Sequence, residues 1–262
     1  MLIALISDSQ RHLYLSNELT DSGYDTNVYR TVDEIPSEIK ADIIVLPIPT
    51  KDKDGFLNIK GSFKMTVENL ISRTNSNSYV ITCNYECNDR KFTDINKYEK
   101  FTSLNAIPSA EGAVFEAMKN SNIPLYGAKS LVVGYGRIGK IIAHRMHSFC
   151  SATTVVARNP KDRYAATALG LKAIDFSELL EEIATYDFIF QTVPHLVLTE
   201  KHLALTKATI IELSSKCAGT DYEFAKKNGN NLLYCPALPE KYSKDYAAKV
   251  FADSVKSILE KI

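Results

Sequence analysis

The sequence predicts an α/β fold in two domains, each built around an open, mainly parallel sheet. Short apolar runs alternate with helical patterns, and runs that are apolar on both faces are typical of parallel strands covered by helices. One such run is followed by the spacing G-x-G-x-x-G at Gly134, Gly136 and Gly139. The 262 residues are also many for a single core. We therefore expect a flavodoxin-like N-terminal sheet and a C-terminal Rossmann domain.

The N-terminal domain is expected over residues 1–104. Its strands are predicted at 2–6, around Val28, at 43–46 and at 79–82, and its helices up to about Thr20 and over about 62–73. This part has no phosphate-binding glycine loop. The segment 7–11 follows the first strand, at the edge where sheets of this type usually present ligands.

Residues 105–124 are expected to connect the domains through a helix that runs to about Lys119. Pro108 suits the first turn of such a helix, and an apolar stripe follows it at Ala110, Val114 and Ala117. The tail 243–262 is amphipathic as well. By analogy with other proteins of this layout, we expect the tail to pack back on the N-terminal domain.

The Rossmann domain is expected over residues 125–242. Strands are predicted at 131–133, 154–157, near 173, at 188–191, 209–213 and 232–234, with helices after the glycines, over 162–169 and from 177. This alternation fills the chain between the connecting helix and the tail. It is the complete pattern of a dinucleotide-binding sheet.

The glycines predict the position of the bound dinucleotide. Gly134 permits a tight turn, Gly136 lets the backbone approach a diphosphate, and Gly139 lets the helix pack close to the strand. Arg137 and Ile138 begin the helix, whose first N–H groups and positive end favour a phosphate. All five residues are cofactor-binding candidates. The alternative is a purely structural glycine turn.

Arg158 predicts which dinucleotide binds. It lies about 20 residues beyond the glycines, where NAD-binding sheets place an Asp or Glu that accepts from the ribose hydroxyls. A guanidinium would instead hold the 2′-phosphate of NADP through charge-assisted hydrogen bonds. Asn159 belongs to the same candidate site, and Lys161 and Arg163 could assist. We therefore expect NADP, with a solvated surface arginine as the alternative.

The segment after the strand 188–191 is expected to border the nicotinamide. Thr192, Val193 and Pro194 are assigned to the cofactor site for this reason. His195 is a candidate for proton transfer because its ordinary pKa is about 6.5. A histidine at a strand end is equally often a surface or packing residue.

Composition excludes several other classes of protein. The formal net charge is zero, which argues against nucleic acid or an anionic membrane as the main partner. Five cysteines without framework spacing indicate reduced thiols in the cytoplasm. Cys83 and Cys87 lack a second pair of ligands, so no metal site is expected. No apolar stretch reaches the length of about 20 residues that a bilayer requires.

Several sequence blocks resemble one family. These are Asn-Ala-Ile-Pro-Ser-Ala-Glu-Gly at 105–112, the glycine motif, and the segments 219–222 and 236–239. Together they are similar to the A subunit of dipicolinate synthase from spore-forming bacteria. The resemblance implies NADP-dependent oxidation of dihydrodipicolinate, a dicarboxylate ring, to dipicolinate in the cytoplasm of the mother cell during sporulation. It also implies a partner, the flavoprotein-like B subunit of dipicolinate synthase.

The sequence departs from this family in three loops. At 7–11 this chain has Ser-Asp-Ser-Gln-Arg where the family has Gly-Gly-Asp-x-Arg. At 214–219 it has Ser-Ser-Lys-Cys-Ala-Gly where the family has Ala-Ser-Arg-Pro-Gly-Gly. At 237–241 it has Ala-Leu-Pro-Glu-Lys where the family has Gly-Leu-Pro-Gly-Lys. These loops are expected to face the substrate. The substrate is therefore less well defined by the sequence than the cofactor.

A dianionic ring needs positive partners and hydrogen-bond donors. Arg11, Lys216, Lys241 and Ser109 are the substrate-binding candidates, the serine through a position near the start of the connecting helix. Lys216 is also a catalytic candidate. Glu111 is a candidate proton acceptor, although an acid in the first turn of a helix is often only a favourable charge.

Two other functions remain open at this point. One is an NADP-dependent 2-hydroxy-acid dehydrogenase, although no histidine follows His202 to form the usual acid–base pair. The other is a non-catalytic NADP-binding subunit. The sequence leaves open the ring isomer, the subunit that carries the chemistry, and the oligomeric state, a homo-oligomer included.

Overall fold

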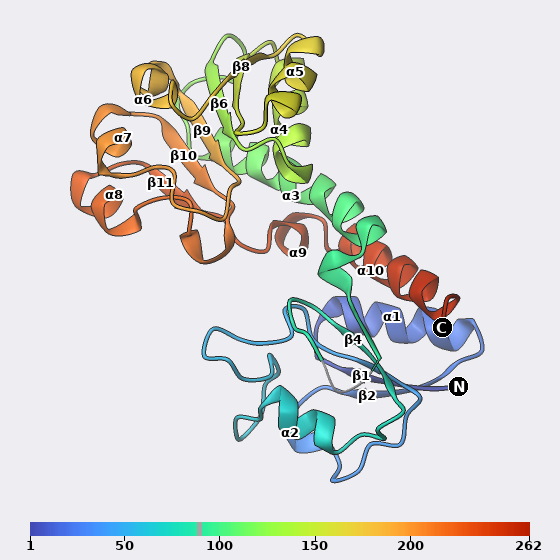
Figure 1. The fold of residues 1–262 in the computed structure, drawn as a ribbon. Coiled ribbons are helices and arrows are strands. Elements are labelled where there is room, and N and C mark those ends of the chain that lie inside the picture. Colours follow the sequence, from blue (N-terminus) through green and yellow to red (C-terminus); the bar gives the residue numbers. More distant parts are fainter. Residues whose placement is uncertain (88–90) are drawn as a thin grey trace. The chain divides into compact units, whose positions relative to one another are not determined.

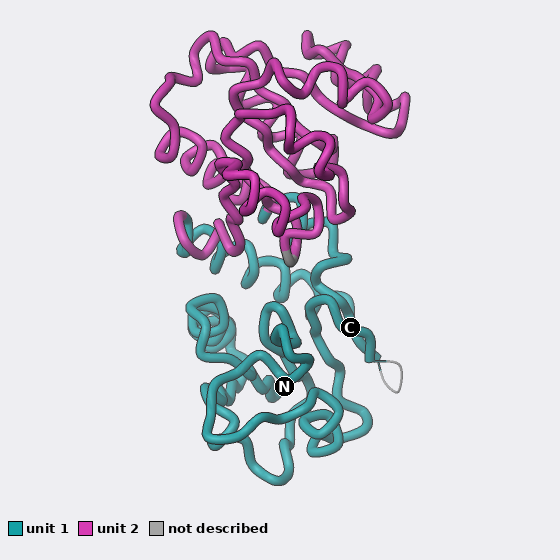
Figure 2. Tube along the Cα trace, turned by 90° about the vertical axis from the view of Figure 1, so that its left-hand side faces the viewer, with its two compact units in different colours: residues 1–105, 243–262 teal, residues 106–242 magenta. Residues whose placement is uncertain are grey.

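The computed structural model describes residues 1–87 and 91–262 and contains two compact units. Residues 1–105 and 243–262 form the first unit, and residues 106–242 form the second (Figure 2). Each unit is built on its own parallel sheet. The predicted α/β fold class is therefore confirmed. Among the described residues, none of the helices combines the length and apolarity of a membrane span.

The first unit contains a five-stranded sheet in the order β2-β1-β3-β4-β5, with every pair parallel. The strands are β1 (Leu2–Ile6), β2 (Asp25–Tyr29), β3 (Ile43–Val45), β4 (Tyr79–Thr82) and β5 (Phe92–Asp94). The helices are α1 (Gln10–Asp21), α2 (Val67–Ser72), α10 (Lys244–Leu259) and the short 3-10 turns η1 (Val32–Glu34) and η2 (Ile95–Lys97). The strand order reverses between β1 and β3.

The two faces of this sheet are covered by different helices because side chains alternate along each strand. Ile3 and Leu5 pack in one cluster with apolar residues of α1 and α10. Ala4 and Ile6 face the other cluster, which contains residues of α2. Figure 1 shows α10 beside α1, and Lys256 forms an ion pair with Glu18 across them. The C-terminal helix is thus part of the core of the first unit.

Two elements of this unit differ from the sequence prediction. The helix expected over about 62–73 begins only at Val67, because the Thr66 side chain accepts a hydrogen bond from Asn69 N and caps it there. Strand β5 was not predicted. It has only three residues and no apolar run, so it follows from pairing with β4 and not from local sequence.

Helix α3 (Glu99–Lys119) passes from the first unit into the second. The prediction that it starts at Asn105 was wrong. The helix begins at Glu99, an acid in the first turn, and Phe101 is already buried in the core of the first unit. Pro108 therefore lies inside the helix and not in its first turn.

The second unit contains a six-stranded parallel sheet in the order β11-β10-β9-β6-β7-β8. The strands are β6 (Lys129–Val133), β7 (Ala152–Val156), β8 (Lys172–Ile174), β9 (Phe188–Gln191), β10 (Thr209–Glu212) and β11 (Leu232–Tyr234). Counted from β6, this is the strand order of a Rossmann sheet. The order reverses between β6 and β9, which is where such sheets bind their ligands.

Helices cover both faces of this sheet (Figure 1). They are α4 (Arg137–Ser148), α5 (Pro160–Ala168), α6 (Leu179–Glu182), α7 (Glu200–Leu205), α8 (Tyr222–Asn228) and α9 (Leu238–Tyr242), with the 3-10 turns η3 (Ile183–Thr185) and η4 (Ser215–Cys217). Val132 and Phe190 pack with α4 and the second half of α3. Val133 and Ile189 pack on the opposite face with α6 and α7.

Candidate functional site

The three glycines of the motif have different surroundings. A Cβ on Gly134, whose φ is +98°, would lie 2.6 Å from Thr192 Oγ1, and one on Gly139 would lie 2.2 Å from the carbonyl oxygen of Gly134. A Cβ on Gly136 would meet no atom within 4 Å. Packing therefore requires the first and third glycines. The second one keeps the space in front of α4 open.

This open space lies at the N-terminus of α4. Gly136 is the N-cap residue and has no side chain to accept from the first N–H groups of the helix, and no acid lies in the first turn. Arg137 and Ile138 begin the helix. The positive end of α4 therefore meets the open side of Gly136, an arrangement that fits a diphosphate.

A pocket of about 480 Å³ opens beside this turn. It lies at the carboxyl ends of β6, β7 and β9, at the reversal of strand order. Its lining includes Gly134, Tyr135, Gly136, Ala157, Arg158, Asn159, Asp162, Phe176, Val193, His195 and Val197. Six residues predicted from the sequence thus line one pocket: two glycines, Arg158, Asn159, Val193 and His195.

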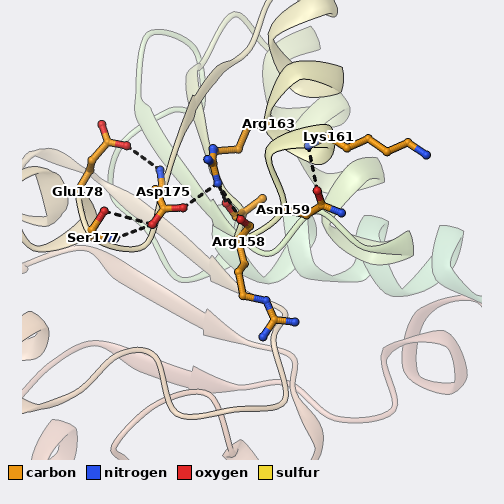
Figure 3. A network of polar contacts seen from close by, with 8 residues as sticks. Arg158, Asn159, Lys161, Arg163, Asp175, Ser177 and Glu178 are labelled. Atoms are coloured by element: carbon orange, nitrogen blue, oxygen red, sulfur yellow. Dashed lines mark hydrogen bonds and ion pairs between the residues drawn. The ribbon is translucent and has the colours of Figure 1, made fainter.

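Arg158 is the residue at the end of β7 that could distinguish between nucleotides. Its side chain is exposed, and within the described residues its guanidinium has no hydrogen bond or ion pair. Figure 3 shows it extending away from the polar contacts of its neighbours. Asn159 uses its side-chain oxygen to cap α5, accepting from Lys161 N at 3.0 Å. The other charged residue of the lining, Asp162, lies 3.9 Å from the Lys140 ammonium.

The segment after β9 is held by a residue that the sequence did not single out. Gln191 is fully buried, and its Oε1 accepts from Val193 N at 2.8 Å. Its Nε2 donates to the Gly219 carbonyl at 2.8 Å. Thr192 is fixed by its hydroxyl, which donates to the Val133 carbonyl at 2.8 Å. Pro194 and His195 follow as exposed residues, and His195 reaches the pocket.

A buried carboxylate holds the loop after β10 through hydrogen bonds. Glu212 is fully buried, and its two oxygens accept from Ser214 N at 2.7 Å and from Thr220 Oγ1 at 2.6 Å. Lys216 belongs to η4 in this loop, but its side chain lies outside the described part of the structure. Burial and the charge of Glu212 raise the pKa of Cys217 to about 11. The thiol therefore stays protonated at neutral pH.

The segment 219–222, one basis of the family resemblance, has a structural explanation here. A Cβ on Gly219 would lie 2.6 Å from the Gln191 amide. Thr220 donates to Glu212, and Asp221 caps α8 by accepting from Phe224 N at 3.0 Å. The segment thus fixes the end of the loop that carries Lys216.

Two other candidates are engaged elsewhere in the second unit. The Lys241 ammonium forms an ion pair with Glu116 of α3, which also accepts from the Tyr242 hydroxyl. Burial disfavours the charge of Glu116, but these donors outweigh it and lower its pKa. Glu111 lies 3.3 Å from Arg145. To act on a substrate, Lys241 and Glu111 would first have to leave these partners.

Ser109 does not have the environment that was expected. Because α3 begins at Glu99, Ser109 lies in its interior, buried, and the N-terminus of the helix cannot assist it. This part of the prediction was wrong, since Pro108 had been taken as the first turn.

Arg11 belongs to the first unit, in the first turn of α1. It is buried, its Nη2 donates to Asn105 Oδ1 at 3.2 Å, and its guanidinium lies 5.8 Å from the centre of the Phe101 ring. The next residue, His12, is fully buried and was not singled out by the sequence. Burial lowers the pKa of His12 to about 4.

Among the described residues, no group of three or more His, Cys, Asp or Glu side chains is placed to hold a metal ion.

Comparison with known proteins identifies the type of the second unit. Residues 105–214 match the family model for the NAD-binding domain of D-isomer specific 2-hydroxyacid dehydrogenases. The chain therefore carries a dehydrogenase-type domain for a nicotinamide dinucleotide. The match includes the glycine turn, Arg158 and the segment after β9.

The whole chain is similar to the A subunit of dipicolinate synthase. It is 26% identical to that protein of Bacillus subtilis (strain 168) over 275 residues, covering 100% of this chain and 92% of the relative. The crystal structure of the dipicolinate synthase A subunit from Bacillus halodurans superposes with a TM-score of 0.87 at 23% identity, covering 98% of this chain and 97% of the other. The predicted resemblance is confirmed.

The same fold occurs in other oxidoreductases. The apo-structure of D-lactate dehydrogenase from Escherichia coli superposes with a TM-score of 0.65 at 15% identity, covering 100% of this chain and 97% of the other. At this identity the likeness concerns the fold alone.

Proposed function

We propose that this chain, which is similar along its length to the A subunit of dipicolinate synthase, oxidises dihydrodipicolinate to dipicolinate with NADP⁺ as the hydride acceptor. The observation that carries the proposal is Arg158, which lines the dinucleotide pocket with an exposed guanidinium. The full-length similarity to this relative supports the substrate.

Arg158 supports NADP over NAD on electrostatic grounds. A 2′-phosphate would meet a guanidinium at the end of β7, where NAD-binding sheets place a carboxylate. A hydrogen bond to a charged group contributes about 1.5–3 kcal/mol, or about 10- to 150-fold in affinity. Asn159 and Lys161 follow Arg158 at the start of α5 and belong to the same proposed site.

The reaction removes a hydride from one carbon of the dihydropyridine ring and a proton from a neighbouring atom, and the ring becomes aromatic. When bound, NADP⁺ accepts the hydride. The protein must orient the ring and offset the charge of its two carboxylates. Lys216, in the loop fixed by Glu212, is the proposed cation of the second unit, and Arg11 is retained as a candidate in the first.

His195 is the proposed proton acceptor among the residues of the pocket. It is exposed, follows the Gln191-held segment and reaches the pocket lining. Glu111 is less suited because Arg145 is paired with it. Because aromatisation makes the overall reaction favourable, a strong base is not required.

The matched family model favours one second candidate, a 2-hydroxy-acid dehydrogenase. Two features of the sequence oppose it. The loop after β10 carries Lys216 as its cation, where such dehydrogenases use an arginine. No histidine follows His202 to complete an acid–base pair. A protein that binds NADP without turnover, as a non-catalytic component of a complex, is the other alternative. The altered loops 214–219 and 237–241 favour this non-catalytic alternative.

The similarity to one component of a synthase also supports a partner, the flavoprotein-like B subunit of dipicolinate synthase, and synthesis in the mother cell of a sporulating bacterium. Both belong to the proposal. A homo-oligomer is compatible with it.

The deciding experiment mixes the purified protein with NADP⁺ and freshly made dihydrodipicolinate, with and without the B subunit. The absorbance of the reduced cofactor is followed. We expect NADPH to form with the dihydro ring as the substrate. Reduction only with 2-hydroxy acids would support the dehydrogenase alternative, and binding without turnover in both mixtures would support the non-catalytic one.

A further inference from the structure

We propose that the ion pair between Arg163 and Asp175 positions Arg158 and thereby sets the preference of this pocket for NADP over NAD. The inference rests on the proposed NADP dependence. The sequence position of Arg163 suggests that it helps to bind the phosphate, whereas this inference gives it a different role. Arg163 would hold the backbone of the phosphate-binding residue and would not bind the phosphate itself.

The contacts of Arg163 are directed at the end of β7. Its Nη1 lies 2.8 Å from the carbonyl oxygen of Ala157 and 2.9 Å from that of Arg158. The same nitrogen lies 2.7 Å from Asp175 Oδ2. Figure 3 shows the guanidinium of Arg163 turned toward this backbone, while the Arg158 side chain extends in another direction. One side chain of α5 thus joins the peptide groups on both sides of Arg158 to Asp175, the residue that follows β8.

Asp175 is itself held in place. Its Oδ1 accepts from the backbone N–H and the hydroxyl of Ser177, both at 3.2 Å. Its backbone N–H donates to Glu178 Oε1 at 2.8 Å. The Ser177 N–H, the Ser177 hydroxyl and the charge of Arg163 lower the pKa of Asp175. The carboxylate therefore remains ionised at neutral pH and keeps Arg163 in its position.

Of the two arginines at this edge, the pairing leaves Arg158 available to the ligand and engages Arg163. The charge of Arg163 is compensated by Asp175, whereas Arg158 has no partner among the described residues. Without Arg163, the 157–158 backbone would be tied to β8 mainly through Ala157 N, which donates to the Ile174 carbonyl at 3.2 Å. A looser backbone spreads the guanidinium over more positions and so weakens a directional contact with a phosphate.

NADP and NAD allow this effect to be separated from a general loss of structure. Only NADP carries the 2′-phosphate, so a displaced Arg158 should weaken NADP and leave the diphosphate contacts at Gly136 unchanged. The test compares dissociation constants for NADP⁺ and NAD⁺, measured by calorimetry, in wild type, Arg163→Ala, Arg163→Lys and Asp175→Asn. The matched control is Lys172→Ala, which breaks another ion pair of this unit, with Glu182 at 2.6 Å.

We expect Arg163→Ala to reduce the ratio of NADP to NAD affinity by about tenfold, the loss of roughly one hydrogen bond to a charged group. Arg163→Lys should restore part of the ratio, since its ammonium can still donate to carbonyls. Asp175→Asn should lower the ratio in the same direction, and it serves as the test if Arg163→Ala does not fold. Lys172→Ala should leave the ratio unchanged.

The outcomes separate this inference from the proposed function. A wild-type protein that prefers NADP, with a ratio unchanged by Arg163→Ala and Asp175→Asn, would overturn the inference alone. Equal losses for both nucleotides would also overturn it, because Arg163 would then act on the fold in general. A wild type without preference for NADP would overturn the proposed cofactor and the inference together.

Discussion

The substitutions Gly136→Ala and Gly139→Ala should separate binding from stability, although they lie three residues apart. A Cβ at position 136 meets no atom within 4 Å, and the φ of −79° is one that alanine adopts readily. Removing a glycine from such a position stabilises a protein by about 0.4–1 kcal/mol, because the unfolded chain loses freedom. Alanine is a poorer N-cap residue than glycine, which offsets this gain, so we expect Gly136→Ala to fold with nearly unchanged stability.

The same methyl group would occupy the space in front of α4. Keeping a diphosphate away from the helix N-terminus removes at least one charge-assisted contact, which corresponds to about 10- to 150-fold in affinity. NADP and NAD should lose affinity equally, because both carry the diphosphate. Calorimetry with both nucleotides measures this loss.

At position 139 the expectation is the opposite. A Cβ would lie 2.2 Å from the carbonyl oxygen of Gly134, a backbone atom that cannot move aside alone. Overpacking of this kind costs about 1–3 kcal/mol or more, and each kcal/mol lowers the melting temperature of a chain of this size by about 2–4 °C. Thermal unfolding should show a lower midpoint. A Gly136→Ala protein that binds both nucleotides normally, or a Gly139→Ala protein as stable as wild type, would refute the reasoning.

Two further predictions concern buried polar groups. Thr220→Val removes the hydroxyl that donates to the buried Glu212 carboxylate, so it should lower the free energy of unfolding by about 1–3 kcal/mol. Thr220→Ser keeps a hydroxyl and should not lower it. Equal stabilities of the two variants in denaturant titrations would contradict the role of this hydrogen bond. His12 has a folded pKa of about 4, below its ordinary value of 6.5, so the unfolded chain takes up the proton first as the pH falls. Stability should therefore decrease from about pH 6.5 down to about pH 4, by up to roughly 1.4 kcal/mol per pH unit from this group. His12→Gln should flatten that part of the curve, and an unchanged pH dependence would exclude the contribution.

The glycine turn and the strands of the two sheets other than β5 were predictable because they depend on local pattern. Apolar runs such as 43–46 and 188–191 correspond to strands wherever helices can cover both faces. The spacing of the glycines reflects contacts within one strand–turn–helix unit, apart from the contacts with Thr192 and Val193. Such features can therefore be predicted from a sequence window of a few residues.

The residues that support the site were not predictable in this way. Gln191 and Glu212 end apolar strands and read as strand residues, and their roles depend on Gly219 and on the loop after β10. A polar residue at the carboxyl end of a buried strand was the available signal. The pair Lys241–Glu116 joins residues 125 positions apart, so no local pattern could show that the lysine is already engaged.

The start of α3 shows how a strong local rule can mislead. Proline is favoured in the first turn of a helix, and Pro108 therefore suggested a start at Asn105. The core of the first unit extends the helix back to Glu99, because Phe101 is buried there. Packing thus outweighed the local preference, and Ser109 lies mid-helix as a consequence.

The proposed preference for NADP is tested most directly by the substitution Arg158→Asp, with the dissociation constants of NADP⁺ and NAD⁺ measured in the same buffer. The side chain is exposed and has no partner among the described residues, so the fold should be unaffected. We expect NADP affinity to fall by about 10- to 150-fold or more, because a guanidinium contact is replaced by a like charge, while NAD affinity changes little. Equal changes for the two nucleotides would contradict the assignment of Arg158 to the 2′-phosphate.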